Sequence, residues 1–200
     1  MTERIDVAIS VLKNLGLFCP KHRTPKRHSY FCGICFCARL MLSLPHYIQK
    51  MEFNQHNKQE YPPMHTAEHI LNGTMVRMFG CGRSFSAHIE RKKSKCDYRL
   101  ATPLSESQLR GVEDAVNAVI GRGLPVTTEV VCQEDVADRF DLSRLPDDAS
   151  AMVRIVHVGD YDECLCVGAH VENTSQIGHF RISSARFSGG VQRIVFRLDE

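Results

Sequence analysis

The chain has 200 residues, enough for one domain of ordinary size with a modest appendage. Its hydrophobic fraction of 43% and charged fraction of 24% are typical of a globular protein and exclude a disordered or collagen-like chain. The net charge of +2 hides an asymmetry: residues 1–50 carry 8 Lys and Arg against 2 Asp and Glu, whereas residues 51–200 carry 17 against 21. Contact between the larger part and a nucleic acid must therefore depend on local basic clusters.

Nine cysteines are an odd number, and no apolar run in the sequence is long enough for a signal peptide core or a membrane span. We therefore expect a cytoplasmic protein in a reducing compartment, with no membrane partner and no disulfide-linked partner. In that compartment the cysteines are either buried thiols or metal ligands.

The first fifty residues form a basic, cysteine-rich extension. It contains two pairs with knuckle-like metal-ligand spacing, and these are Cys19 with His22 and Cys32 with Cys35. A second metal site is one interpretation of them. The other is that Met51 is the true start codon, so that residues 1–50 are not part of the real protein. Residues 51–63 are interpreted as a polar linker and residues 64–200 as the main domain.

The main domain begins with a helix predicted over residues 64–79, where apolar residues recur at helical spacing until Gly80 and Gly82. Strands are predicted at 85–90 and 95–101. A capping box of Ser105 and Gln108 predicts a helix that ends near Gly121. The remaining predicted elements are a strand at 125–131, a short helix at 133–140 and strands at 151–158, 179–187 and 191–198. Without regular βαβ alternation, this order predicts an α+β fold, mostly antiparallel sheet packed with helices.

Two split pairs of residues carry the predicted chemistry. His65 and His69 are four residues apart at the start of the first helix, so both imidazoles lie on one face, one turn apart. Cys166 and His170 supply a thiolate and an imidazole, and Gly168 between them allows a tight turn. Each pair alone is a weak signal, since surface histidines occur four apart by chance. Together they predict a zinc site between a helix start and a Cys-x-x-x-His loop.

These motifs, in this order, resemble a known family. The run His65-Thr-Ala-x-His69, followed about a hundred residues later by Cys166-x-Gly-x-His170-Val-x-Asn-Thr-x-x-Ile-Gly, is similar to the editing domain of alanyl-tRNA synthetase. That domain is shared with free-standing alanyl-tRNA editing proteins and, more distantly, with threonyl-tRNA synthetase, as the threonyl/alanyl second additional domain. The run Gly189-Gly-Val-Gln-Arg-Ile194 is a further family pattern, and the resemblance covers residues 61–198.

The resemblance implies a zinc-dependent hydrolase of translation fidelity that removes the amino acid from mischarged tRNA in trans. It implies Zn²⁺ as cofactor, aminoacylated tRNA as partner, and no aminoacylation activity. A site that hydrogen-bonds a hydroxyl strongly rejects an analogue without one. The first expected substrate is therefore Ser-tRNA(Ala), with Gly-tRNA(Ala) second. Alternatives are Ser-tRNA(Thr), a non-catalytic zinc and RNA-binding module, and an H-x-x-E-H metallopeptidase with a glutamate as third ligand.

Four residues are candidates for the catalytic site or substrate pocket, namely Thr66, Glu68, Asp97 and Gly168. Thr66 matches a family position near the metal, and its alternative role is a helix cap. Glu68 is interpreted as a general base or as a solvated helix residue. Asp97 is interpreted as a group that orients a ligand histidine or as an exposed strand carboxylate.

Two positions between Cys166 and His170 depart from the family pattern. Val167 stands where glycine is usual, and Ala169 stands where threonine is frequent. Neither change removes a ligand, but both leave the amino-acid specificity open. For tRNA binding, the densest basic cluster of the main domain is the strand turn with Arg91, Lys92, Lys93 and Lys95, which suits phosphate contacts or is a solvated hairpin tip. Weaker candidates are Arg181, Arg186 and Arg193.

Overall fold

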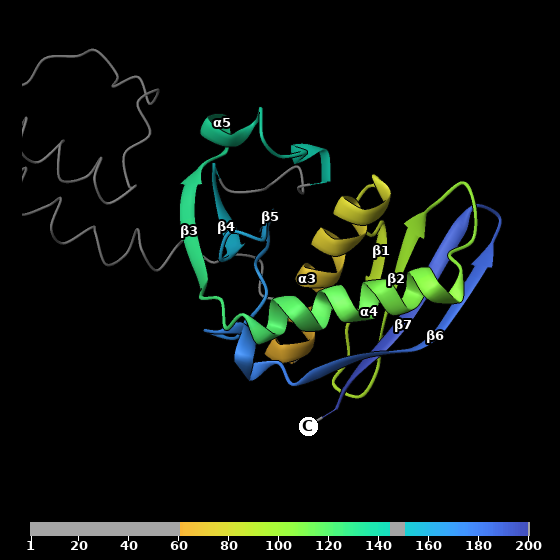
Figure 1. Ribbon diagram of the computed structural model, residues 1–200. Coiled ribbons are helices and arrows are strands. Elements are labelled where there is room, and N and C mark those ends of the chain that lie inside the picture. Colours follow the sequence, from red (N-terminus) through yellow and green to blue (C-terminus); the bar gives the residue numbers. More distant parts are fainter. Residues whose placement is uncertain (1–60, 145–150, 200) are drawn as a thin grey trace, which may run out of the picture. The chain divides into compact units, whose positions relative to one another are not determined.

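The computed structural model describes residues 61–144 and 151–199 (Figure 1). The predicted cysteine-rich extension, with the second metal site at Cys19, His22, Cys32 and Cys35, lies outside the described residues and stays a prediction. The described residues divide into two compact units. The main unit contains residues 61–129 and 154–199, and the smaller unit contains residues 130–144 and 151–153.

The main unit holds both long helices and the larger sheet. Its elements are α3 Pro62–Phe79, β1 Ser86–His88, β2 Ser94–Arg99, α4 Glu106–Gly121, β5 Asp162–Leu165, a 3₁₀ helix at Thr174–Gln176, β6 His179–Ser188 and β7 Val191–Asp199. Two strands, β3 Val126–Cys132 and β4 Met152–Val158, pass from one unit to the other. The smaller unit adds α5 Gln133–Val136 and a 3₁₀ helix at Leu142–Arg144.

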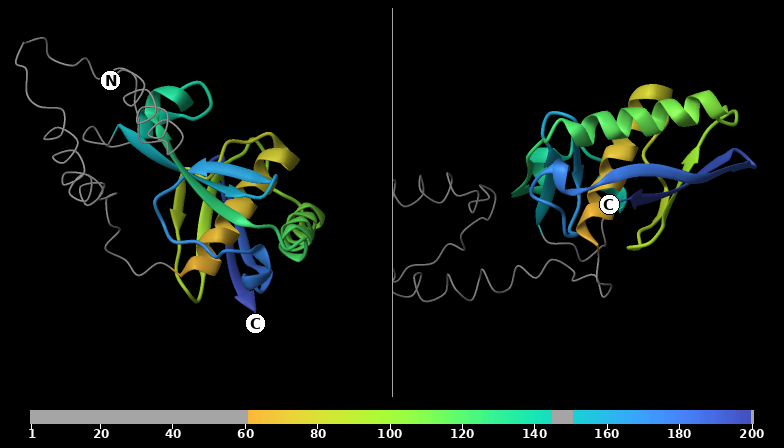
Figure 2. Two further views of the ribbon diagram at one scale, coloured as in Figure 1. Left: turned by 90° about the vertical axis from the view of Figure 1, so that its left-hand side faces the viewer. Right: turned by 60° about the horizontal axis from the view of Figure 1, so that its bottom comes forward.

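The strands form two sheets. β1, β2, β7 and β6 form a four-stranded sheet in that order, and each neighbouring pair is antiparallel. β3, β4 and β5 form a three-stranded sheet in that order, in which β4 and β5 are antiparallel. Helix α4 runs along one side of β6 and β7, as the right-hand view of Figure 2 shows. The predicted α+β class with mostly antiparallel sheet packed with helices is confirmed.

Local sequence signals set the ends of the two long helices. Ser105 accepts a hydrogen bond from the Gln108 backbone at 3.2 Å, and the Gln108 side chain accepts one from the Ser105 backbone at 2.9 Å, so the predicted capping box forms. Helix α3 begins at Pro62, two residues before the predicted start, since proline suits the first turn. It ends at Gly80, whose φ of 61° is the left-handed conformation that glycine adopts readily.

One hydrophobic core joins α3, α4 and the four-stranded sheet. Its members include Met64, Ala67, Ile70 and Leu71 from α3, Val112 and Val116 from α4, and Cys96, Tyr98, Phe180, Ile194 and Phe196 from the sheet. A second stripe of α3, whose residues are four apart, faces β5. Neither α3 nor α4, the long helices among the described residues, has the length and apolar content that a membrane crossing requires.

The core side of α3 also buries a carboxyl group. Glu68 accepts a hydrogen bond from the Asn72 side chain, and the Asn72 side-chain oxygen accepts one from the Ser84 backbone at 2.9 Å. Burial, which disfavours the charged form, raises the pKa of Glu68 to about 7. The interpretation of Glu68 as a solvated helix residue is therefore wrong.

We predict that Glu68→Gln changes how stability depends on pH. Between pH 4.5 and 7 the folded protein keeps a proton that the unfolded chain has already lost, so the wild-type free energy of unfolding falls as pH rises through this window. A shift from 4.5 to about 7 corresponds to on the order of 3 kcal/mol. In denaturant unfolding of metal-free protein, the glutamine variant should gain stability relative to wild type by up to this amount between pH 4 and pH 8.

The matched control for this prediction is Glu106→Gln, which removes an exposed carboxylate from α4. Its unfolding free energy should follow the wild-type pH dependence. Parallel curves for wild type and Glu68→Gln would contradict the burial argument.

Candidate metal centre

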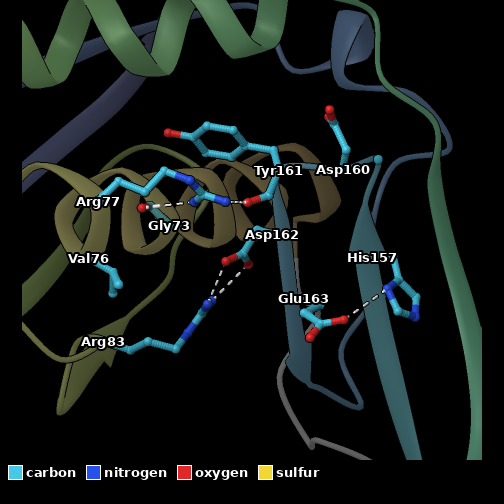
Figure 3. Close-up of a pocket in the computed structure, with 10 residues that line it drawn as sticks. Gly73, Val76, Arg77, Arg83, His157, Asp160, Tyr161, Asp162 and Glu163 are labelled. Carbon is cyan, nitrogen blue, oxygen red and sulfur yellow. Dashed lines mark hydrogen bonds and ion pairs between the residues drawn. The ribbon is translucent and has the colours of Figure 1, made fainter. Parts of the chain in front are cut away.

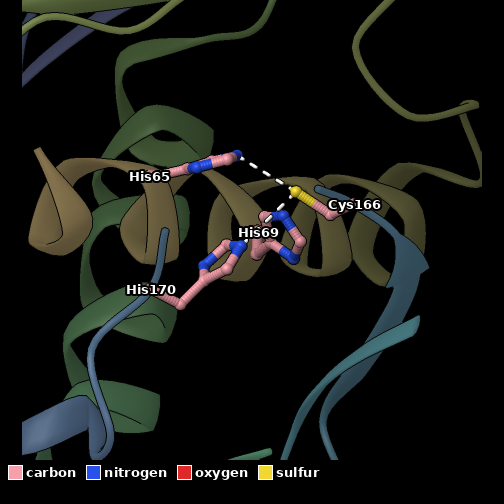
Figure 4. A group of neighbouring side chains, drawn as sticks. All are labelled: His65, His69, Cys166 and His170. Carbon is pink, nitrogen blue, oxygen red and sulfur yellow. Dashed lines mark hydrogen bonds between the residues drawn. The ribbon is translucent and has the colours of Figure 1, made fainter. Parts of the chain in front are cut away.

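The four ligand residues expected from the sequence lie together in the main unit (Figure 4). His65 and His69 come from α3, one turn apart. Cys166 follows the last residue of β5, and His170 lies four residues farther along the same loop. One nitrogen or sulfur atom of each residue lies within 4.8 Å of the others. Two segments about a hundred residues apart therefore present four donor atoms to one point.

The separations between donor atoms fit a shared zinc ion. Cys166 Sγ lies 3.4 Å from His65 Nε2 and 3.4 Å from His170 Nε2. Zinc–sulfur and zinc–nitrogen bonds of normal length, set at a tetrahedral angle, place two such ligand atoms about 3.6 Å apart. Three imidazoles and one thiolate are also a donor set that suits zinc. The group can therefore hold this metal without rearrangement of its elements.

Burial keeps two of the histidines uncharged. It lowers the pKa of His69 well below its ordinary value, with neighbouring cationic groups, His170 first, adding to the effect. It also lowers the pKa of His170, to about 3, helped by His65 and Arg154. A histidine binds a metal through the lone pair of its neutral form. Both side chains are therefore in the ligand form at neutral pH.

Thr66 fixes the orientation of His170. The Thr66 hydroxyl donates its hydrogen to the Pro62 carbonyl at 2.9 Å and accepts a hydrogen bond from the Val171 backbone at 3.2 Å. His170 Nδ1 lies 3.2 Å from the same oxygen, so Nδ1 must be the donor there, which leaves Nε2 free for a metal. Thr66 lies inside α3 and is fully buried, so the helix-cap interpretation is wrong.

Arg154 on β4 holds the loop that carries Cys166. Its Nε donates to the Cys166 carbonyl at 2.7 Å, and its Nη2 donates to the Gly168 carbonyl. The Gly168 backbone N–H in turn points at Cys166 Sγ, 3.4 Å away. Gly168 therefore contributes to the site through its backbone, as a support for the thiol.

Asp97 lies away from this group, on the four-stranded sheet. Its carboxylate accepts two hydrogen bonds of 2.7 Å from Arg193 on the neighbouring strand β7. These hydrogen bonds hold the pKa of Asp97 below its ordinary value. Asp97 is 6% exposed and pairs with an arginine, so it is neither an exposed carboxylate nor a partner of a ligand histidine.

Sequence reasoning missed a group of polar residues beside His69. Asp162 and Cys164 lie on β5, and Arg83 reaches Asp162 from the segment before β1. Alternate residues of a strand share a face, so Asp162 and Cys164 point the same way as their neighbour Cys166. This two-residue spacing is visible in the sequence, but it is informative only once residues 162–165 are known to be a strand.

A pocket of about 610 Å³ adjoins this polar group (Figure 3). Its wall includes Gly73, Arg77, Arg83, Tyr161 and Asp162. The Arg77 guanidinium lies 4.1 Å from the centre of the Tyr161 ring and donates to the Gly73 carbonyl at 3.1 Å. Asp162 thus belongs both to the pocket wall and to the surroundings of His69.

The basic turn between β1 and β2 lies near the start of α3. Arg91, Lys92 and Lys93 of this turn are exposed, and so is Lys95 on β2. The Arg91 guanidinium lies 5.1 Å from the centre of the Tyr61 ring, and the Tyr61 carbonyl accepts a hydrogen bond from the His65 backbone at 3.1 Å. The turn therefore adjoins the helix end that carries the first ligand.

Comparison with known proteins agrees with this arrangement. Residues 153–195 match the family described as the threonyl and alanyl tRNA synthetase second additional domain. The alanine–tRNA ligase of Fervidobacterium nodosum is 33% identical over 132 residues, and that of Caldicellulosiruptor saccharolyticus is 35% identical over 133 residues. Each alignment covers 65% of this chain but only 15% of the relative.

The matched part of the chain contains two of the four clustered residues, Cys166 and His170, and follows the motif order of the resemblance. The alignments to the ligases span about the length of the described residues. Residues 153–195 therefore belong to the family described as the threonyl and alanyl tRNA synthetase second additional domain, and the chain is similar to alanine–tRNA ligases over 65% of its length.

Proposed function

We propose that this chain hydrolyses the ester bond between a wrongly attached amino acid and the terminal ribose of tRNA, with zinc at the group of His65, His69, Cys166 and His170. The observation that carries the proposal is the convergence of these four donor atoms within a chain of the editing-domain family. The proposal concerns ester hydrolysis alone, and we expect no aminoacylation by these 200 residues.

Zinc, when bound, supplies Lewis-acid polarisation of a carbonyl or a lowered pKa of bound water. His65, His69, Cys166 and His170 would hold the ion. Other residues of the chain keep these four side chains in position. Thr66 holds His170 through Nδ1, and Arg154 holds the loop of Cys166, so the donor atoms are fixed before the substrate arrives.

Serine attached to alanine tRNA is the proposed substrate, with glycine attached to the same tRNA second. The curated relatives are alanine–tRNA ligases, which supports alanine tRNA as the carrier. Serine exceeds alanine by one hydroxyl, and a pocket that hydrogen-bonds this hydroxyl leaves a polar group unpaired when alanine enters. Serine attached to threonine tRNA is the alternative, because the matched family includes threonyl-tRNA synthetases.

The β1–β2 turn is the proposed contact for the tRNA backbone. Arg91, Lys92 and Lys93 of the turn and Lys95 on β2 are exposed, and Arg91 contacts Tyr61 at the start of the helix that carries His65. A phosphate chain bound at this turn lies close to the metal centre. The main domain has a small excess of acidic residues, so this local cluster carries the attraction.

The first prediction of this proposal concerns zinc content. Cys166→Ala removes the thiolate from the group, so purified full-length protein should contain one zinc ion fewer per chain than wild type. Cys81→Ala is the matched control, because Cys81 is a half-buried thiol outside the ligand group. Zinc measured by atomic absorption should be equal in this control and wild type. Equal zinc in all three proteins would contradict the metal assignment.

The second prediction concerns deacylation. Wild type should rapidly release serine from Ser-tRNA(Ala) and spare Ala-tRNA(Ala), whereas folded Cys166→Ala should be inactive. The measurement follows labelled amino acid on purified tRNA, with Ser-tRNA(Thr) as a third substrate. Preference for Ser-tRNA(Thr) would move the specificity to the threonine system. If zinc-loaded protein hydrolyses none of these, a non-catalytic zinc and RNA-binding module replaces the proposal.

The third prediction concerns tRNA binding. Removal of one lysine that binds a phosphate should reduce the slope of log affinity against log salt by roughly 0.7–0.9. Lys92→Ala with Lys93→Ala should therefore weaken binding of tRNA at low salt and flatten this slope. Arg110→Ala is the control, because Arg110 is an exposed cation on α4. An unchanged slope in the double variant would exclude the turn as a binding site for phosphates.

A further inference from the structure

His69 lies between α3 and β5, next to polar side chains that are not part of the four-ligand group. Its side chain is 2% exposed. Cys164 Sγ lies 3.4 Å from Nδ1 and 3.6 Å from Nε2, and Asp162 Oδ2 lies 3.7 Å from Nδ1. The imidazole therefore has a thiol and a carboxylate close to it, with the carboxylate beside Nδ1.

The carboxylate of Asp162 lies between Arg83 and helix α3 (Figure 3). Arg83 donates to both of its oxygens, at 2.7 Å and 3.0 Å, and the Asp162 side chain is 5% exposed. On the other side lies the backbone of α3 at Gly73, where an added Cβ would be only 3.0 Å from Asp162 Oδ1. A side chain at this position would therefore force the carboxylate to shift by a few tenths of an ångström.

We propose that Asp162, held by Arg83, is a positioning residue that keeps the imidazole hydrogen of His69 on Nδ1 and so directs Nε2 to the metal. This inference rests on the proposed zinc centre. A carboxylate paired with a guanidinium only accepts hydrogen bonds, so it favours a hydrogen on the nearest ring nitrogen. At 3.7 Å it acts by electrostatic attraction in a buried site rather than by a direct hydrogen bond.

The thiol of Cys164 does not decide the tautomer. A thiol donates and accepts only weakly, and its sulfur lies almost equally far from the two ring nitrogens, 3.4 Å from Nδ1 and 3.6 Å from Nε2. His69 and His170 then have similar surroundings at Nδ1. His170 has Nδ1 occupied by Thr66, and His69 has Nδ1 beside Asp162. Metal-binding histidines generally have such a partner on the second nitrogen.

His69, Asp162 and Cys164 also lie within 4.8 Å of one another, which suggests a second metal position. Two observations argue against it. Arg83 already occupies both oxygens of Asp162 and would repel a cation bound there. His69 is also a member of the first ligand group. The three residues are therefore better explained as support for the first centre.

The wild-type protein tests the inference directly. In metal-free full-length protein labelled with ¹⁵N-histidine, the ring-nitrogen shifts of His69 should show the hydrogen on Nδ1. A hydrogen on Nε2 of His69 would overturn the inference. This measurement does not depend on whether any variant folds.

Variants add a measurement of zinc affinity. Asp162→Asn, which keeps the shape but adds an N–H donor and removes the charge, should weaken zinc binding about 10–100-fold in competition with a chelator. Asp160→Asn is the matched control, because Asp160 is an exposed aspartate two residues away that pairs with Arg122. It should bind zinc like wild type. Wild-type affinity in a folded Asp162→Asn variant would overturn the inference.

Zinc affinity and tautomer are measured without tRNA, so the inference and the proposed function fail separately. Zinc binding that depends on Asp162, with all three aminoacyl-tRNAs left intact, would overturn the proposed deacylation alone. Deacylation and zinc binding that are both indifferent to Asp162→Asn would overturn the positioning role alone. A wild-type chain that binds no zinc at the four-ligand group would overturn both.

Discussion

Helix α3 is buried on two sides at once, and the other elements of the main unit pack against these two sides. One stripe packs into the apolar core with α4 and the four-stranded sheet, while another faces β5 and carries His65 and His69. Because polar groups without water need partners inside the protein, each polar side chain buried on α3 has one. One of these buried polar side chains, Thr66, also orients His170 of the proposed metal site. At Thr66, the same hydroxyl therefore satisfies a buried polar group and fixes a side chain of the proposed site.

Features with a complete local signal were predictable from the sequence. The capping box of Ser105 and Gln108 sets the start of α4, and Gly80 sets the end of α3, because each depends on residues within one turn. The four residues of the proposed metal site are predictable for a different reason, since their spacing and order match a family. The sequence predicts that they meet in space, but only the fold shows it, because His65 and Cys166 are 101 positions apart.

Features that depend on contacts between distant segments were not predictable. Strand β5 is four residues long and rich in polar residues, so no alternation of apolar residues marks it. Without β5, nothing indicates that Asp162 meets Arg83, 79 residues earlier, or lies beside His69. The role that the sequence suggests for Asp97 is the one that we propose for Asp162. A carboxylate in a strand has no sequence signal that shows whether an arginine or a histidine will face it.

The split origin of the ligands has a consequence for synthesis of the chain. The two histidines of α3 leave the ribosome about a hundred residues before Cys166 and His170. At about 5–20 residues per second, this interval lasts roughly 5–20 seconds. During that time α3 carries only half of the proposed metal site, and β5 is not yet present to cover its polar stripe. Capture of zinc by the proposed site is then a late event in synthesis. A nascent chain that stalls before residue 166 exposes two histidines on α3 without the thiolate and the third imidazole that complete the site.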